Sequence, residues 1–240
     1  MRKINIKKNN KEIHSNQEWL EIAPPEGKEK QWKPLHSASE FADYCLYTDG
    51  YVPKEIDDYL TRLGISGDSF DAEPEYITSL CEYGFGKNGP RHHDLLMWND
   101  EIVVGIEAKA TETLDEYVTD KCKDRFSPNQ ELRYPGLCRE VLGRELKDCS
   151  DIRYQLLSAT AGTLIEARKR GVKKAALIIL LFESEITSKE HILGTKNDVD
   201  VFCNMLKKKC NSSYEIPFAP DIDFCIQFAL MNVDLYHKAK

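Results

Sequence analysis

The sequence predicts a single α/β domain in which helices flank a central mixed β-sheet. Two short apolar runs, 95–98 and 102–106, are separated by Asn99-Asp100, which is the turn expected between antiparallel strands. A third apolar run, 174–182, follows a long helical stretch and has the length and composition of a fully buried strand. A chain of 240 residues is long enough to bury a substantial core around such a sheet.

The first 70 residues are expected to form an N-terminal arm and a helical extension. Apolar residues at helical spacing, preceded by capping or helix-starting residues, predict the helices of this part. They cover residues 16–22, 37–47 and 54–63. Trp19 and Trp32 flank a polar loop in the arm. Large aromatic side chains are usually buried, so we expect both to pin the arm to the body of the protein. The alternative is that they stack on a substrate.

Residues 71–185 are expected to form the core of the domain, and residues 186–240 to complete it. The predicted order in the core is helix, strand, strand, helix, strand. The core helices are expected at 71–82 and 148–170, and its strands at 95–98, 102–106 and 174–182. The other expected elements are a helix at 112–123, an irregular loop at 125–136, a helix at 197–209 and a strand at 222–231.

Three charged side chains mark the open end of the predicted hairpin. Glu107 and Lys109 close the second strand two residues apart, so they point to the same face of the sheet. Asp94 opens the first strand, which places it near both in an antiparallel pair. Two close carboxylates repel each other unless a positive charge lies between them, and Mg²⁺ or Mn²⁺ prefers such oxygen ligands. An alternative is an ion-paired hairpin end, in which Lys109 neutralises both carboxylates and no metal binds.

Asp94, followed on the next strand by Glu107-Ala108-Lys109 with apolar residues before it, resembles the motif of the PD-(D/E)xK nuclease superfamily. His93 stands where the motif often has proline. The resemblance covers about residues 71–183. It implies a restriction-endonuclease-like core (α-β-β-α-β), here with an N-terminal helical extension. It also implies metal-dependent phosphodiester hydrolysis with Mg²⁺ or Mn²⁺ as the cofactor.

The resemblance assigns roles to individual residues. Asp94 and Glu107 would bind the metal, with the Ala108 carbonyl as a third ligand, and Lys109 would position or activate the attacking water. Gln155, on the helix after the second strand, resembles the polar residue that the superfamily offers to the site, and Glu75 is the candidate for an additional acidic ligand. The candidate substrate contacts are Lys87, Arg91, Arg133, Arg153 and Tyr154.

The expected partner is nucleic acid, with DNA favoured over RNA. Nucleases of this superfamily often pair to cut two strands, so a homodimer stays open. The net charge of −7 fits a nonspecific DNA binder poorly and favours the alternative of a catalytically inactive domain that acts as a binding or assembly module. A hydrolase of another small phosphate compound is a third, weaker option. Eight scattered cysteines, with no signal peptide and no apolar run of membrane-spanning length, indicate a cytoplasmic protein without a membrane partner.

Overall fold

A computed structural model describes the chain except for residues 26–31, 87–88, 122–127, 210–211 and 238–240. The strands are β1 (Lys3–Lys8), β2 (Lys11–Glu12), β3 (Ser69–Thr78), β4 (Arg91–Trp98), β5 (Ile102–Lys109), β6 (Lys174–Glu183), β7 (Lys207–Lys208), β8 (Tyr214–Glu215) and β9 (Asp223–Asn232). The α-helices are α1 (Asn16–Ile22), α2 (Ser37–Leu46), α3 (Lys54–Arg62), α4 (Pro128–Leu137), α5 (Tyr154–Arg170), α6 (Lys189–Met205) and α7 (Asp234–His237).

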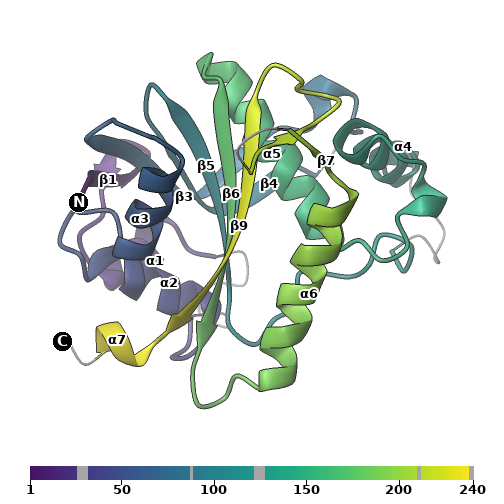
Figure 1. Cartoon of the computed structure of the whole chain (residues 1–240). Helices are drawn as coiled ribbons and strands as arrows, with labels where there is room; N and C mark the ends of the chain where they lie inside the picture. Colours follow the sequence, from purple (N-terminus) through teal and green to yellow (C-terminus); the bar gives the residue numbers. More distant parts are fainter. Residues whose placement is uncertain (26–31, 87–88, 122–127, 210–211, 238–240) are drawn as a thin grey trace.

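The strands form one mixed sheet in the order β2-β1-β3-β4-β5-β6-β9-β8-β7. The pairs β1–β3, β5–β6 and β6–β9 are parallel, whereas β3–β4 and β4–β5 are antiparallel. Figure 1 shows the sheet between α1, α2 and α3 on one side and α4, α5 and α6 on the other. The predicted fold class, an α/β protein whose central mixed sheet is flanked by helices, is therefore confirmed.

Each face of the sheet has its own apolar core. The first core packs residues of α1, α2 and α3 against one face, and it contains Trp19 and Phe41. The second core packs α4, α5 and α6 against the other face, and it contains Leu156 and Phe202. The strand β6 supplies alternate residues to both cores, which explains its continuous apolar sequence. None of the helices in the described part of the chain has the length and apolar character that a membrane crossing requires.

The structure confirms several elements that were predicted from local patterns. The hairpin forms between β4 and β5, and the side chain of Asn99 accepts hydrogen bonds from the backbone of Glu101 and Ile102 at 2.9 and 3.0 Å. α1 lies where a helix was predicted, and Ser15 caps it by accepting from the Glu18 amide at 3.2 Å. The elements α2, α3, β6 and β9 lie where the sequence predicts them.

The helix predicted at residues 71–82 is wrong, because this segment is the strand β3. Tyr76, Ile77 and Leu80 have helical spacing, but Phe70, Ala72 and Pro74 are buried at the period of two that a strand requires. β3 lies between the parallel β1 and the antiparallel β4. Pairing on both edges stabilises the strand more than local propensity favours a helix. The first element of the predicted core order is therefore a strand and not a helix.

Five further segments differ from the prediction. Residues 112–121 are not helical, although Leu114 and Val118 are buried as expected. Residues 128–137 form α4 rather than a loop. α5 begins at Tyr154, after a 3₁₀ turn, and α6 begins at Lys189 rather than near 197. The segment 207–208 pairs with β8 as β7 instead of ending a helix. Most of these errors lie outside the main sheet strands, where tertiary contacts decide the local conformation.

Candidate functional site

A cavity of about 370 Å³ lies at the open end of the β4–β5 hairpin. Its floor includes Ala108 and Lys109 at the carboxyl end of β5. α2 contributes Ser37 and Phe41 on one side, and the first two turns of α5 contribute the other wall. In α/β proteins, ligands bind outside the carboxyl ends of the strands, where loops and helix starts converge. The predicted motif thus lies at the position in the fold where a ligand site is expected.

The Asp94 carboxylate lines this cavity and holds the hairpin end together. The regular strand pairing ends at Leu95 and Ile106. Beyond it, Oδ2 of Asp94 accepts a hydrogen bond of 2.7 Å from the Ala108 amide. Within the described part of the chain, Oδ1 of Asp94 accepts no hydrogen bond. Asp94 therefore presents one oxygen that is available to a ligand in the cavity.

Glu107 lies one layer behind the cavity wall and is fully buried. Its Oε1 forms an ion pair with the Arg91 guanidinium, and its Oε2 accepts a hydrogen bond of 2.8 Å from Gln155 Nε2. A buried carboxylate is costly unless it is paired with a cation and hydrogen-bonded, and both conditions are met here. Arg91 and Gln155 both line the cavity, so they separate Glu107 from it.

His93 contributes no charge to this pair. Its ring is fully buried, and its Nδ1 lies 3.9 Å from Oε1 of Glu107. Burial, and then the positive charge of Arg91, hold the pKa of His93 well below its ordinary value. The imidazole is therefore neutral at physiological pH, and Arg91 supplies the positive charge that Glu107 requires.

Lys109 lies at the cavity, with 8% of its surface exposed. Among the described residues Lys109 makes no ion pair, and Glu107 pairs with Arg91 instead. The predicted alternative, in which Lys109 neutralises Asp94 and Glu107, is therefore wrong about these ion pairs. Glu112 lines the cavity nearby. Burial raises the pKa of Glu112, but hydrogen bonds from Ser37 and Ala110 and the charge of Lys109 outweigh burial, so its net pKa is lowered. Lys109 is thus a cation that lines the same cavity as Asp94 and Glu112 and is held in no ion pair by the described residues.

Glu75 lines the cavity from β3, not from a helix as predicted. The flanking pairs Pro74–Leu95 and Tyr76–His93 place it opposite Asp94 on the neighbouring strand. Its φ of 49° is in the left-handed region, which is unusual for a residue with a side chain. Such backbone conformations often occur at functional sites, where the surrounding structure holds them.

The five predicted substrate contacts have different environments. Arg91 and Tyr154 line the cavity. Arg133 is buried and donates to the Phe85 carbonyl at 2.8 Å. Arg153 does not line the cavity, because its guanidinium pairs with Asp198 at 2.7 Å and stacks 3.8 Å from the Tyr117 ring centre. Lys87 lies outside the described residues.

Sequence reasoning missed several residues of the cavity. Glu112 and Asp115 line it, although they lie in a polar stretch that was predicted to be a helix. Their only sequence signal is that they follow Lys109 closely. Trp19 and Trp32 also reach the cavity. Trp19 is 3% exposed and Trp32 packs against the first core, which confirms that they pin the arm to the body.

The cavity contains oxygen ligands of the kind that a hard divalent cation prefers, but among the described residues Asp94, Glu107 and Glu75 do not bring three ligand atoms within 4.8 Å of one another. Asp94 and Glu75 line it with carboxylate side chains, Ala108 lines it as well, and Glu107 lies behind Arg91 and Gln155. Oxygen ligands of this kind suit Mg²⁺ and Mn²⁺ rather than softer metals. The available Oδ1 of Asp94 is consistent with such a ligand. The residues therefore fit a Mg²⁺ or Mn²⁺ ion in chemical type.

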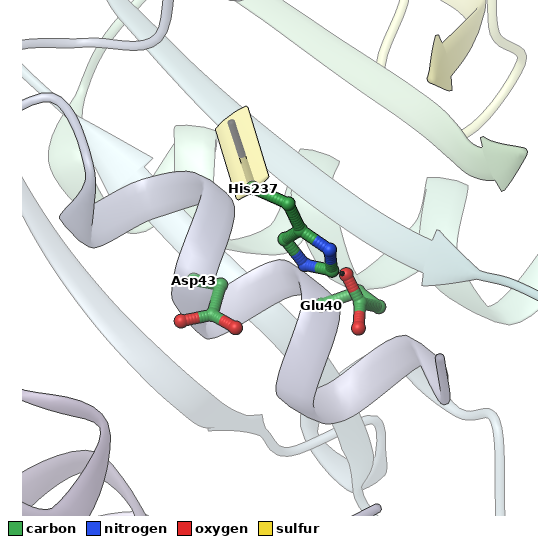
Figure 2. Close-up of side chains that lie close together, drawn as sticks. All are labelled: Glu40, Asp43 and His237. Atoms are coloured by element: carbon green, nitrogen blue, oxygen red, sulfur yellow. Dashed lines mark ion pairs between the residues drawn. The ribbon is translucent and has the colours of Figure 1, made fainter. Parts of the chain in front are cut away.

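A second group of possible ligands lies elsewhere, and Figure 2 shows it. In the described part of the chain, one group of three acidic or histidine side chains has its ligand atoms within 4.8 Å of one another, and it consists of Glu40, Asp43 and His237. Oε2 of Glu40 is 3.0 Å from His237 Nε2 and accepts from the Tyr236 hydroxyl at 2.7 Å. Each of these contacts joins α7 to α2. We interpret the group as an attachment of the C-terminal helix rather than a metal site.

Comparison with known proteins identifies the family but not an activity. Residues 12–231 match the model of a family described as a domain of unknown function, DUF6946. Because this match spans most of the 240 residues, the chain belongs to that family. No curated protein and no solved structure matches the sequence.

Proposed function

We propose that this protein is a metal-dependent phosphodiesterase of the PD-(D/E)xK nuclease type. The observation that carries the proposal is the convergence of Asp94, Ala108 and Lys109 on one cavity, with Glu107 directly behind. The antiparallel β4–β5 hairpin, then α5 and the parallel β6, provide the strand-strand-helix-strand part of the proposed restriction-endonuclease-like core. Mg²⁺ or Mn²⁺ is the proposed cofactor.

Each residue has a specific role in this proposal. Asp94 and Glu107 would hold the cation, with the Ala108 carbonyl as a third ligand and Glu75 as an additional one. The cation would act as a Lewis acid toward a phosphoryl oxygen. Lys109 would orient the attacking water and stabilise the negative charge that develops on the phosphate in the transition state. Gln155 would keep the Glu107 carboxylate in position through its 2.8 Å hydrogen bond.

The proposed substrate is nucleic acid, with DNA ahead of RNA, and pairing of two copies would allow both strands to be cut. The test is hydrolysis of labelled single- and double-stranded DNA and RNA with Mg²⁺ or Mn²⁺. Lys109→Ala should reduce the rate by about 100-fold or more. Lys189→Ala, which removes an exposed lysine from α6, is the matched control and should leave the rate unchanged. Equal rates for wild type and Lys109→Ala would contradict the mechanism.

A second candidate function is a binding or assembly module without catalytic activity. The engagement of both Glu107 oxygens by Arg91 and Gln155 favours it, because a carboxylate held in this way is less available to a metal. The net charge of −7 points in the same direction. Calorimetric titration with Mn²⁺ separates the two functions. Heat of binding that disappears in Asp94→Asn supports the nuclease, and a silent titration of the wild type supports the module.

A further inference from the structure

Arg91 occupies a special position among the charged groups of the cavity. It is the first residue of β4, and its side chain is 12% exposed. The stem packs against α5, since a Cβ on Gly162 would lie 3.1 Å from Arg91 Cγ. The guanidinium forms the ion pair with Glu107 and also lies in the field of Asp94, Glu75 and Asp115. Arg91 is therefore surrounded by carboxylates, one of which is buried and the others at the cavity.

The Glu107 carboxylate cannot serve Arg91 and a divalent cation equally well. Oε1 faces Arg91, and Oε2 is held by Gln155. A guanidinium and a divalent ion at the same carboxylate repel each other, and burial makes this repulsion stronger than it would be in water. Removing a cation from a buried carboxylate is also costly unless another cation replaces it. Arg91 and a metal ion are therefore alternative partners of Glu107.

Arg91 has unused donors for a different partner. A guanidinium carries five N–H donors, and the buried Arg91 Nε has no hydrogen-bond partner within the described part of the chain. Its planar fork matches two oxygens of a phosphate group. Because Arg91 already lines the cavity, a guanidinium released from Glu107 has phosphate-sized space beside it.

We propose that Arg91 is a displaceable internal cation, which neutralises Glu107 until a metal ion takes its place and then binds a phosphate group of the ligand. This inference rests on the proposed function and deepens it. The ligand class is a phosphate monoester or diester anion. Because one guanidinium serves both sites in turn, metal and phosphate bind with positive coupling, each raising the affinity for the other by the same factor.

The test measures binding, not hydrolysis. Mg²⁺ is titrated calorimetrically into wild type and Arg91→Gln, and thymidine 5′-monophosphate is titrated into each protein with and without saturating Mg²⁺. In the wild type, Mg²⁺ should raise the affinity for the nucleotide at least tenfold. Arg91→Gln should bind Mg²⁺ at least tenfold more tightly than wild type, because its competitor is gone. Its nucleotide coupling should fall to the smaller part that direct contact between the cation and the phosphate supplies.

Two further variants distinguish displacement from a structural role. Arg170→Gln is the matched control, because Arg170 also pairs with a buried carboxylate, Glu166, but lies outside the cavity lining. It should leave Mg²⁺ affinity and nucleotide coupling unchanged. Arg91→Lys keeps the charge if Arg91→Gln does not fold. It should bind Mg²⁺ within about threefold of the wild-type affinity but show weaker nucleotide coupling, because an ammonium lacks the planar fork.

Each outcome supports or overturns the inference. Unchanged or weaker Mg²⁺ binding by a folded Arg91→Gln, or nucleotide coupling in it as large as in the wild type, would overturn displacement while leaving the proposed function standing. Nucleotide coupling in Arg91→Lys as strong as in the wild type would also overturn displacement. If the wild type binds no Mg²⁺, the proposed function fails, and this inference fails with it.

Discussion

Replacing Gly162 with alanine tests how closely α5 is packed against the site. Gly162 lies in the middle of α5, where an added Cβ would be 2.7 Å from Nε2 and 2.9 Å from Cε1 of His93. Real Cβ atoms essentially never make contacts this short, so the ring or the helix must move. His93 is fully buried and cannot swing away into solvent.

Two opposing effects determine how much Gly162→Ala changes the free energy of unfolding. Alanine is favoured over glycine in a helix interior by about 1 kcal/mol. Overpacking a well-filled core costs about 1–3 kcal/mol. The free energy of unfolding of Gly162→Ala should therefore fall by about 0–2 kcal/mol. Gly194 provides the matched control, because it also lies in a helix, α6, and nothing is within 4 Å of its added Cβ. Gly194→Ala should gain up to about 1 kcal/mol.

The assay is thermal or urea unfolding of the two variants beside the wild type. The difference between them isolates the overpacking cost, about 1–3 kcal/mol, and each kcal/mol corresponds to about 2–4 °C in Tm for a chain of this size. If Gly162→Ala is stabilised as much as Gly194→Ala, α5 does not pack against His93 as described. The tight placement of Arg91 beside Glu107 would then also be in doubt, because Arg91 packs against the same glycine.

Three other changes have defined outcomes. Glu112→Gln should lower stability by about 1.5–3 kcal/mol near neutral pH by weakening the 2.7 Å hydrogen bond from Ser37. Because the pKa of Glu112 is lowered in the folded protein, the stabilisation by its carboxylate is complete above the ordinary pKa of 4.5 and is lost as the pH falls below it. The free energies of unfolding of wild type and variant should therefore converge in acid. A difference between them that stays constant from pH 7 to pH 3.5 would refute this. Tyr236→Phe removes a 2.7 Å hydrogen bond to the buried Glu40 carboxylate and should cost about 1.5–3 kcal/mol in urea unfolding, and an unchanged midpoint would argue against the attachment of α7. Leu96→Ala empties a fully buried position of the second core and should cost about 2–5 kcal/mol, whereas a loss below 1 kcal/mol would show that the site is loosely packed.

The local patterns of the sequence were sufficient where one short segment contains the whole signal. Asn99 lies in the turn and caps it with its own side chain, so the hairpin was predictable. The alternation of β5 places Glu107 and Lys109 on one face regardless of what packs against them. The apolar run of β6 indicated burial on both sides, and both cores include its residues.

Only the tertiary structure decided which groups meet at the site and which strand pairs where. β3 is a strand because β1 and β4 pair with both of its edges, although part of its sequence has helical spacing. The pairing of Glu107 with Arg91, rather than with Lys109, depends on α5 pressing Arg91 against the sheet. Glu112 reaches the cavity through the path of a loop that has no periodic pattern. Alternation determines the face on which a side chain lies, but its electrostatic partner depends on the packing of segments that are distant in the sequence.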